Sequence, residues 1–260
     1  MTGDASTGTF LQGLERGLAV IGAFSADAPS QTLSEVARTV GITPATARRI
    51  LLTLEELGYV RNDSRRFSLT PRVLALGWAY LSSLDLGELA GPFMEELSAK
   101  TRESCSIATL DLPDIVYVAR VPTSRIMTVA LGVGARLPAY PTSMGRVLLA
   151  GLGDDELTSY LSTLHAESLT TRTVTSPDRL RGTIDRARSD GYALVDQELE
   201  LGLRSIAAPI HNSRGRIIAA LNVSAHASRS TATSLRTEVL PHLQQAATQI
   251  TTALTHRGQL

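Results

Sequence analysis

Between Gly41 and Gly58 the sequence specifies one helix together with both of its ends. Thr43 is a suitable N-cap, Pro44 suits the first helical position, and Gly58 suits the residue that follows the last turn. The apolar residues between them recur at helical spacing and define one buried face: Ala47, Ile50, Leu51 and Leu54. The segment therefore predicts a helix over residues 44–57.

The solvent-facing side of this helix carries two adjacent arginines near its start. Arg48 and Arg49 lie where the positive end of the helix dipole disfavours positive charge, so another requirement must place them there. A helix that enters the major groove of DNA needs guanidinium groups at its leading end, where they meet phosphates and guanine edges. The first two turns of the helix expose Arg48 and Arg49 to solvent, together with the small residues Ala45 and Thr46. We interpret the segment as a DNA-recognition helix.

Two further helices precede this one. Apolar spacing predicts a first helix from residue 10 to about residue 24 and a second, short helix over residues 33–40. Thr32 or Ser34 would cap the second helix, and Gly41 would end it. Helix, tight turn and helix with an exposed polar start form a helix-turn-helix.

A basic hairpin follows the recognition helix. Residues 59–61 and 67–69 alternate as two strands around the polar turn 62–66, and the turn carries two arginines at its tip. This order of elements predicts a winged helix-turn-helix over residues 10–72. We expect it to contact double-stranded DNA through Thr43, Ala45, Thr46, Arg48, Arg49, Arg65 and Arg66.

The charge of the chain supports this interpretation. Formal net charge is zero overall, but seven arginines face only three acidic residues between Arg38 and Arg72. Such a local basic stripe indicates an anion-facing surface. Two alternatives are a small helical subdomain with solvated charges and an RNA-binding winged helix. The RNA-binding alternative lacks the exposed aromatic residues that would stack on single strands.

The rest of the chain predicts a linker helix and an α+β domain. Residues 1–9 are small and polar, and we expect them to be disordered. A helix from Pro71 to about Leu86 supplies a linker over residues 73–86 and leaves residues 87–260 for the second domain. Strands joined by short turns there indicate a largely antiparallel sheet covered by helices. The expected strands are 104–110, 115–121, 126–131, 192–196, 205–210 and 217–225, and the expected helices are a first one ending near 102, then 142–152, 154–164, 177–190 and 233–255.

The sequence also argues against several classes of protein. One cysteine, Cys105, allows no intramolecular disulfide and no thiolate cluster, and none of the five histidines has metal-ligand spacing. No segment approaches the ~20 apolar residues that span a bilayer, so we expect a cytoplasmic protein without a membrane partner. The GxSxG and SxxK patterns fail around Ser143, because Pro141 and Arg146 occupy decisive positions. We expect a binding protein with no catalytic residue, metal or cofactor; the alternative is a small-molecule-binding enzyme whose basic N-terminus binds nucleic acid nonspecifically.

One region has the features of a ligand pocket. A helix N-terminus follows the extended, proline-punctuated segment 137–142, and its free N–H groups suit a carboxylate. Asn222 and Ser224 share one face of a predicted strand, and Ser205 could join them from the next. An organic acid held by a helix end and a few small polar side chains would fit this arrangement. The alternative is that these are merely small residues in a packed sheet.

From about residue 10 to its end, the chain resembles the IclR family of bacterial transcriptional regulators. The resemblance rests on the stretch Gly191-Tyr-Ala-Leu-Val-Asp-Gln-Glu198, on Ser205-Ile-Ala207 after six intervening residues, and on Ile210-His211-Asn212. It implies a winged helix-turn-helix, a linker helix and a GAF-like α+β effector-binding domain. It also implies dimers or pairs of dimers. The first helix carries more apolar residues than its small domain needs, which indicates either subunit pairing or a wide core face.

Carried over residue by residue, the resemblance implies an effector pocket lined by Ser143, Met144, Val195, Ser205, Asn222 and Ser224. Val195 departs from the family pattern, which expects Asp or Ser, so a polar contact is lost there. The segment 196–206, with Arg146 after Gly145, is similar to the subgroup that controls protocatechuate and 4-hydroxybenzoate breakdown, whose effectors are aromatic acids or β-ketoadipate. We expect a ligand-responsive regulator of aromatic-acid catabolism genes; the alternative is an IclR-type regulator of another carboxylic-acid pathway.

Overall fold

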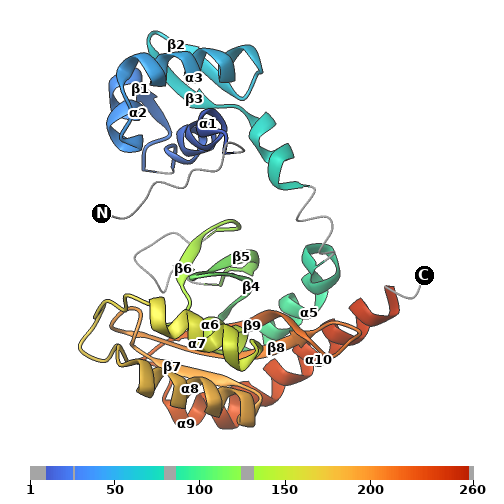
Figure 1. Ribbon diagram of the computed structural model, residues 1–260. Helices are drawn as coiled ribbons and strands as arrows, with labels where there is room; N and C mark the ends of the chain where they lie inside the picture. Colours follow the sequence, from blue (N-terminus) through green and yellow to red (C-terminus); the bar gives the residue numbers. More distant parts are fainter. Residues whose placement is uncertain (1–9, 26, 79–85, 124–131, 258–260) are drawn as a thin grey trace. The chain divides into compact units, whose positions relative to one another are not determined.

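The computed structural model describes residues 10–25, 27–78, 86–123 and 132–257. The chain divides into two compact units, Met1–Tyr80 and Leu81–Leu260. Figure 1 shows the elements of each unit. The expected disordered tail, residues 1–9, lies outside the described residues, as does the expected strand over 126–131.

The N-terminal unit packs three helices against a three-stranded antiparallel sheet of order β1-β3-β2. One small core joins them, centred on Val20, Val36, Leu51 and Phe67. The elements are α1 (Gln12–Gly22), β1 (Ser30–Thr32), α2 (Leu33–Val40), α3 (Pro44–Glu56), β2 (Val60–Asp63) and β3 (Arg66–Leu69).

The helix ends in this unit follow from local sequence signals. Thr32 accepts a hydrogen bond from the Glu35 N–H, and the Glu35 carboxylate accepts one from the Thr32 N–H, so Thr32 is the cap of α2. Gly41 ends α2 with a φ of +72°, a conformation that favours glycine. Thr43 caps α3 by accepting from the Thr46 N–H. The predicted bounds of α2 and the start of α3 are confirmed.

The wing is tighter than the sequence predicted. Its turn contains only Ser64 and Arg65, with φ values of +51° and +70°, which is the geometry of a two-residue hairpin turn. The prediction that Arg66 lies at the tip was wrong, because Arg66 is the first residue of β3 and pairs with Thr32 of β1. Strand β1 itself was not expected. Its buried Gln31 donates to the Ala23 carbonyl at 2.7 Å and so ties the strand to the end of α1.

The predicted linker helix is only partly described. Residues Pro71–Val73 form a 3-10 turn, residues 74–78 are α-helical, and 79–85 lie outside the described residues. Leu74, Leu76 and Trp78 expose 76%, 52% and 68% of their surfaces.

The C-terminal unit is built on a six-stranded antiparallel sheet of order β6-β5-β4-β9-β8-β7. Helices cover both faces (Figure 1): α5 and α10 pack on one, and α6, α7 and α8 on the other. The strands are β4 (Ser104–Asp111), β5 (Asp114–Val121), β6 (Arg136–Pro138), β7 (Ala193–Asp196), β8 (Leu203–His211) and β9 (Ile217–His226); the main helices are α5 (Leu86–Thr101), α6 (Ser143–Ala150), α7 (Asp154–Thr163), α8 (Pro177–Asp190) and α10 (Leu240–Arg257).

The α+β prediction for this unit is confirmed, and the differences are local. Strand β6 was not expected, and the first helix of the unit, α5, begins at Leu86 and contains Pro92. The predicted last helix is interrupted: a short helix, α9 (Ala232–Ser234), leads into a π-helical turn, η2 (Leu235–Val239), before α10.

Candidate functional sites

The start of α3 presents the residues expected to read DNA. Ala45, Arg48 and Arg49 are exposed, and Thr46 is half-buried. The hydroxyls of Thr43 and Thr46 lie 2.9 Å apart, and Thr43 also caps the helix, so these two threonines fix the helix start. No contact with DNA tests the set, and it stays a prediction.

A groove between α1 and α3 adds a residue that the sequence analysis missed. Its volume is about 340 Å³, and it is lined by Gly13, Arg16, Gly17, Thr46, Arg49, Ile50, Thr53 and Leu54. Arg16 of α1 therefore faces the same groove as Arg49 of α3. The signal in the sequence is the pair of glycines four residues apart, which leaves this side of α1 without bulky side chains around Arg16.

The two wing arginines differ in their surroundings. Arg65 lies in the turn and is exposed, as expected of a phosphate contact. Arg66 instead donates to the hydroxyl and carbonyl oxygens of Ser30, and its guanidinium lies 3.7 Å from the Glu35 carboxylate. Arg66 thus ties β3 to β1 and α2, and a role in DNA contact remains a prediction for it.

In the C-terminal unit, the six residues expected to hold an effector line a single cavity. They come from the start of α6 and from strands β7, β8 and β9. Strand register aligns three of them across the sheet, with Val195 opposite Ser205 and Ser205 opposite Ser224. The described residues that line it are Tyr117, Pro141, Thr142, Ser143, Met144, Val195, Leu199, Leu203, Ser205, Asn222 and Ser224.

The polar groups of this cavity are prearranged. Asn222 accepts from the Ser106 N–H and donates to the Ser224 hydroxyl, both at 3.1 Å. Ser143 is 1% exposed, and its hydroxyl has no hydrogen-bond partner among the described residues. The first N–H groups of α6, those of Ser143 and Met144, have no acceptor within the helix. A buried hydroxyl and a helix N-terminus therefore offer donors at the same wall, which suits a carboxylate.

A glycine sets the position of this helix end. A Cβ added at Gly145 would lie 1.9 Å from the Ala139 carbonyl oxygen, so only glycine allows α6 to approach the bend that follows β6 so closely. Thr142 completes the end by accepting from the Gly145 N–H at 3.0 Å. Ser143 and Met144 are thereby held against the sheet.

The cavity is narrow and partly apolar. The volume open to the centre of a water-sized sphere is about 10 Å³, which corresponds to roughly one water molecule. Burial raises the pKa of Tyr117 to about 12, against a smaller opposing effect of Arg120, so its phenol is a neutral hydrogen-bond donor at pH 7. A ring-sized ligand would have to widen this cavity.

A buried ion pair lies beside the cavity. Arg146 of α6 meets the Glu198 carboxylate at 2.6 Å, and the two side chains are only 5% and 9% exposed. Arg146 also donates to the Tyr140 carbonyl, and the same oxygen of Glu198 accepts from the Val174 N–H. The pair joins α6 to the loop after β7, which brings Leu199 to the cavity wall.

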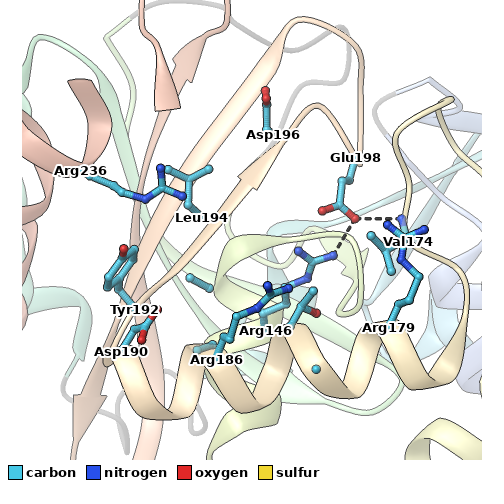
Figure 2. A pocket seen from close by; sticks show the side chains of 14 residues that line it. Arg146, Val174, Arg179, Arg186, Asp190, Tyr192, Leu194, Asp196, Glu198 and Arg236 are labelled. Carbon is cyan, nitrogen blue, oxygen red and sulfur yellow. Dashed lines mark hydrogen bonds and ion pairs between the residues drawn. The ribbon is translucent and has the colours of Figure 1, made fainter. Parts of the chain in front are cut away.

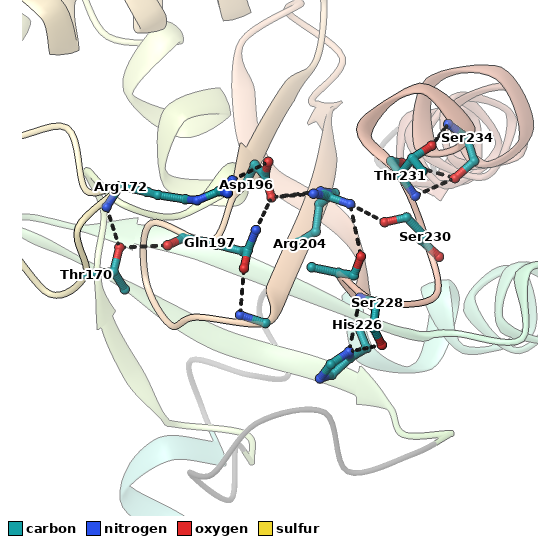
Figure 3. A network of polar contacts seen from close by, with 12 residues as sticks. Thr170, Arg172, Asp196, Gln197, Arg204, His226, Ser228, Ser230, Thr231 and Ser234 are labelled. Atoms are coloured by element: carbon teal, nitrogen blue, oxygen red, sulfur yellow. Dashed lines mark hydrogen bonds and ion pairs between the residues drawn. The ribbon is translucent and has the colours of Figure 1, made fainter.

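A second polar network fixes the same loop (Figure 3). The hydroxyls of Thr170 and Thr173 donate to the carbonyls of Gln197 and Glu198. At the loop's base, the Asp196 carboxylate receives two guanidinium groups, from Arg172 at 3.0 Å and Arg204 at 2.7 Å. Arg204 also donates to the Ser230 carbonyl. The loop is therefore held from both sides.

Metal and membrane sites find no support in the described parts of the chain. No group of three or more His, Cys, Asp or Glu residues there could hold a metal ion. No helix of those parts is long and apolar enough to cross a membrane.

Comparison with known proteins identifies both units. Residues 13–64 match the IclR helix-turn-helix domain, and residues 78–252 match the bacterial transcriptional regulator IclR C-terminal domain. The Pca regulon regulatory protein of Pseudomonas putida is 45% identical over 246 residues, which cover 94% of this chain and 84% of that protein. The p-hydroxybenzoate hydroxylase transcriptional activator of Acinetobacter baylyi is 37% identical over 249 residues, 94% of this chain and 92% of that one.

A solved structure has the same fold over nearly the whole chain. An IclR homolog from Microbacterium hydrocarbonoxydans, crystallised with 4-hydroxybenzoate, superimposes with a TM-score of 0.82 at 27% identity, covering 93% of this chain and 98% of that one. The family and these relatives are transcriptional regulators and not enzymes. The chain belongs to the IclR family of bacterial transcriptional regulators, with a DNA-binding helix-turn-helix and an IclR-type C-terminal domain.

Proposed function

We propose that this regulator controls genes of aromatic-acid catabolism in response to a small organic acid bound in the cavity at the start of α6. The observation that carries the proposal is the convergence of six predicted residues on one cavity, whose buried Ser143 hydroxyl has no hydrogen-bond partner in the part of the chain that the structure describes. The names of the relatives support the proposed pathway. Two are named as regulators of the pca regulon and of p-hydroxybenzoate hydroxylase, and a third was crystallised with 4-hydroxybenzoate. β-Ketoadipate, protocatechuate and 4-hydroxybenzoate are the proposed effectors.

For DNA, we propose that α3 enters the major groove and that the wing contacts phosphates. Exposed Arg48 and Arg49 at the start of α3 can reach base edges, while Arg65 at the hairpin turn can reach a phosphate. A phosphate contact adds affinity for every sequence, whereas a base contact adds preference for one.

For assembly, we propose a dimer or a pair of dimers. Helix α1 and the two residues before it expose more than half of each of four large apolar side chains: Phe10, Leu11, Leu14 and Leu18. Monomeric proteins rarely leave such a cluster in water, so pairing of two copies through this face would bury it. Analytical ultracentrifugation of the full chain and of a Leu14→Glu, Leu18→Glu variant tests this, since the variant should shift toward monomer.

The experiment that tests the function is fluorescence anisotropy with labelled DNA from upstream of the protein's own gene. Protein is titrated at two salt concentrations, with and without each of the three acids. Selective binding that one acid alters would support both regulator and effector class. Binding that is equal for all DNA and abolished by salt would contradict the DNA-reading proposal, and selective binding that no acid changes would contradict the effector class.

Two arginine variants sharpen the DNA measurement. Arg65→Ala should weaken binding to every sequence and lower the slope of log affinity against log salt by about one. Arg49→Ala should instead reduce the preference for the best site, and an unchanged preference would contradict its assignment. Arg216→Ala removes an equal charge from an exposed turn of the C-terminal unit and should change neither property.

Ser143→Ala sharpens the effector measurement. Because the hydroxyl has no hydrogen-bond partner among the described residues, its removal should leave thermal stability unchanged or slightly raised. If the hydroxyl donates to the effector carboxylate, affinity for the acid should fall by about tenfold or more. Ser213→Ala, at an exposed turn, is the matched control. Full affinity in Ser143→Ala would remove this residue from the proposed site.

A further inference from the structure

The described part of the C-terminal unit contains a second cavity that is separate from the effector cavity. It is a cleft of about 650 Å³ between α8, β7 and η2 (Figure 2), and the two cavities share no lining residue. A volume of this size falls within the range of small-molecule sites. The lining is rich in charge and includes four arginines, Arg146, Arg179, Arg186 and Arg236, and three acidic residues, Asp190, Asp196 and Glu198.

The charges of this arginine cleft do not cancel locally. Glu198 is committed to Arg146, and Asp196 is committed to Arg172 and Arg204. Among the described residues, no ion pair or side-chain hydrogen bond engages three guanidinium groups of the cleft: those of Arg179, Arg186 and Arg236. Asp190 is the remaining carboxylate. It lies near Tyr192 in Figure 2, eleven residues beyond Arg179 and four beyond Arg186 on α8, so its charge falls at the Arg186 end of the cleft. The Arg179 end of the cleft is therefore positive.

The spacing along α8 gives the cleft its shape. Arg179 and Arg186 are seven residues apart, which places them on one face of the helix, two turns or about 10 Å from each other. Gly182 lies between them, and a Cβ added there would meet nothing within 4 Å, so the floor between the two guanidinium groups is open. Arg236 faces the cleft from η2, across β7.

We propose that the arginine cleft binds a small dianion, a molecule with two carboxylate or two phosphate groups, held between Arg179 and Arg186. Guanidinium groups bind both kinds of anion through paired, charge-assisted hydrogen bonds, and two of them at this separation favour a ligand whose charges are also apart. This second site goes beyond the proposed effector function. It depends on neither the identity nor the existence of an aromatic-acid effector.

Calorimetric titration of the full-length protein tests the proposal, with adipate as the dicarboxylate probe and pyrophosphate as the phosphate probe. At least one probe should bind with saturation, and which one does so assigns the source of the anion. The double variant Arg179→Gln, Arg186→Gln should weaken that binding at least tenfold. Both arginines are exposed, so the variant should fold normally, and its affinity for 4-hydroxybenzoate should equal that of the wild type.

Two controls separate this site from general charge and from the effector cavity. Arg181→Gln removes the same charge from α8 outside the cleft and should leave probe affinity unchanged. Asn222→Ala, in the effector cavity, should do the same. If Arg181→Gln weakened probe binding as much as the double variant does, the attraction would be nonspecific. If only Asn222→Ala weakened probe binding, the probe would bind in the effector cavity. Either result, or no saturable binding of either probe, would overturn the proposal. A change in subunit association of the double variant with unaltered probe binding would instead make the cleft a protein contact and would also overturn it.

Discussion

Replacing Glu198 by alanine should cost the C-terminal unit a large part of its folding free energy. The substitution leaves the Arg146 guanidinium buried, with 5% of its side chain exposed, and without the carboxylate that it meets at 2.6 Å. Removing one partner of a buried ion pair typically costs about 3–5 kcal/mol, because the remaining charge is desolvated and uncompensated. The Val174 N–H loses its acceptor as well. For a unit of this size, such a loss lowers the melting temperature by roughly 6–15 °C.

A double-mutant cycle separates the ion pair from the loss of packing. Arg146→Met and Glu198→Leu should each be strongly destabilising, whereas the double variant replaces both charges by apolar groups and should lose clearly less than the sum. We expect an interaction free energy of about 1.5–3 kcal/mol, the upper part of the range for residues in contact. Glu96→Ala, which breaks the exposed pair of Glu96 with Lys100 at 2.7 Å, is the control and should cost less than about 1 kcal/mol.

The protein carries its own probe for this measurement. Cys105 is the single cysteine of the chain, and it is fully buried in β4, so its thiol becomes reactive when the C-terminal unit opens. Urea titration with a short pulse of thiol labelling, read by mass spectrometry, gives the unfolding free energy of that unit in the full-length protein. Additive single variants, or a cost below 1 kcal/mol for Glu198→Ala, would refute the argument that the pair matters because it is buried.

Three further outcomes follow from local geometry. Gly145→Ala should lower the free energy of unfolding by about 3 kcal/mol or more and should also weaken effector binding, because its Cβ would overlap the Ala139 carbonyl. Gly91→Ala is the control and should leave the melting temperature unchanged, because a Cβ there meets no atom within 4 Å. Thr43→Ala should cost the N-terminal unit about 1 kcal/mol in urea titration, since it removes the cap of α3. Burial raises the pKa of Cys105 to about 12, so ~10⁻⁴ of the native thiol is ionised at pH 8 and iodoacetamide should label it only on unfolding. Stability should therefore fall as pH rises above about 8.5, where the unfolded thiol ionises first, and fast native labelling would contradict the burial.

The sequence was most informative where structure is decided locally. The end of α2 at Gly41 and the Thr43-Pro44 start of α3 each depend on residues within four positions, and both predictions held; of the two caps considered for α2, the structure has Thr32. The helix over residues 177–190 was predicted with the bounds that α8 has. Such signals are strong because capping and turn conformations involve few groups, all close in the chain.

The misses are contacts between distant segments. Strand β1 exists because it pairs with β3, more than thirty residues later, and its three residues are all polar, so no apolar alternation indicates a strand. Because Arg66 pairs with β1, it lies in strand β3 and not at the tip of the wing, and its guanidinium contacts Ser30 and Glu35. The ion pair of Arg146 with Glu198 spans 52 positions and leaves no spacing that a sequence pattern could reveal. The sequence did not predict the arginine cleft for the same reason, because its lining residues come from segments far apart in the chain.

The expected effector cavity shows what sequence can and cannot supply about a site. Period-two alternation placed Asn222 and Ser224 on one face, and the resemblance added Ser143 and Val195, so the lining could be named in advance. Its size could not, because volume depends on how closely α6 packs against the sheet, and no residue spacing in the sequence gives that distance. A cavity of about 10 Å³ cannot hold an aromatic ring unless a wall moves. Backbone hydrogen bonds hold the strands of the sheet wall and the turns of α6, whereas the loop after β7, which carries Leu199, is held by side-chain contacts. Because Glu198 in that loop is tied to Arg146, we expect the ion pair to set how easily the cavity opens, so that breaking it changes effector affinity as well as stability.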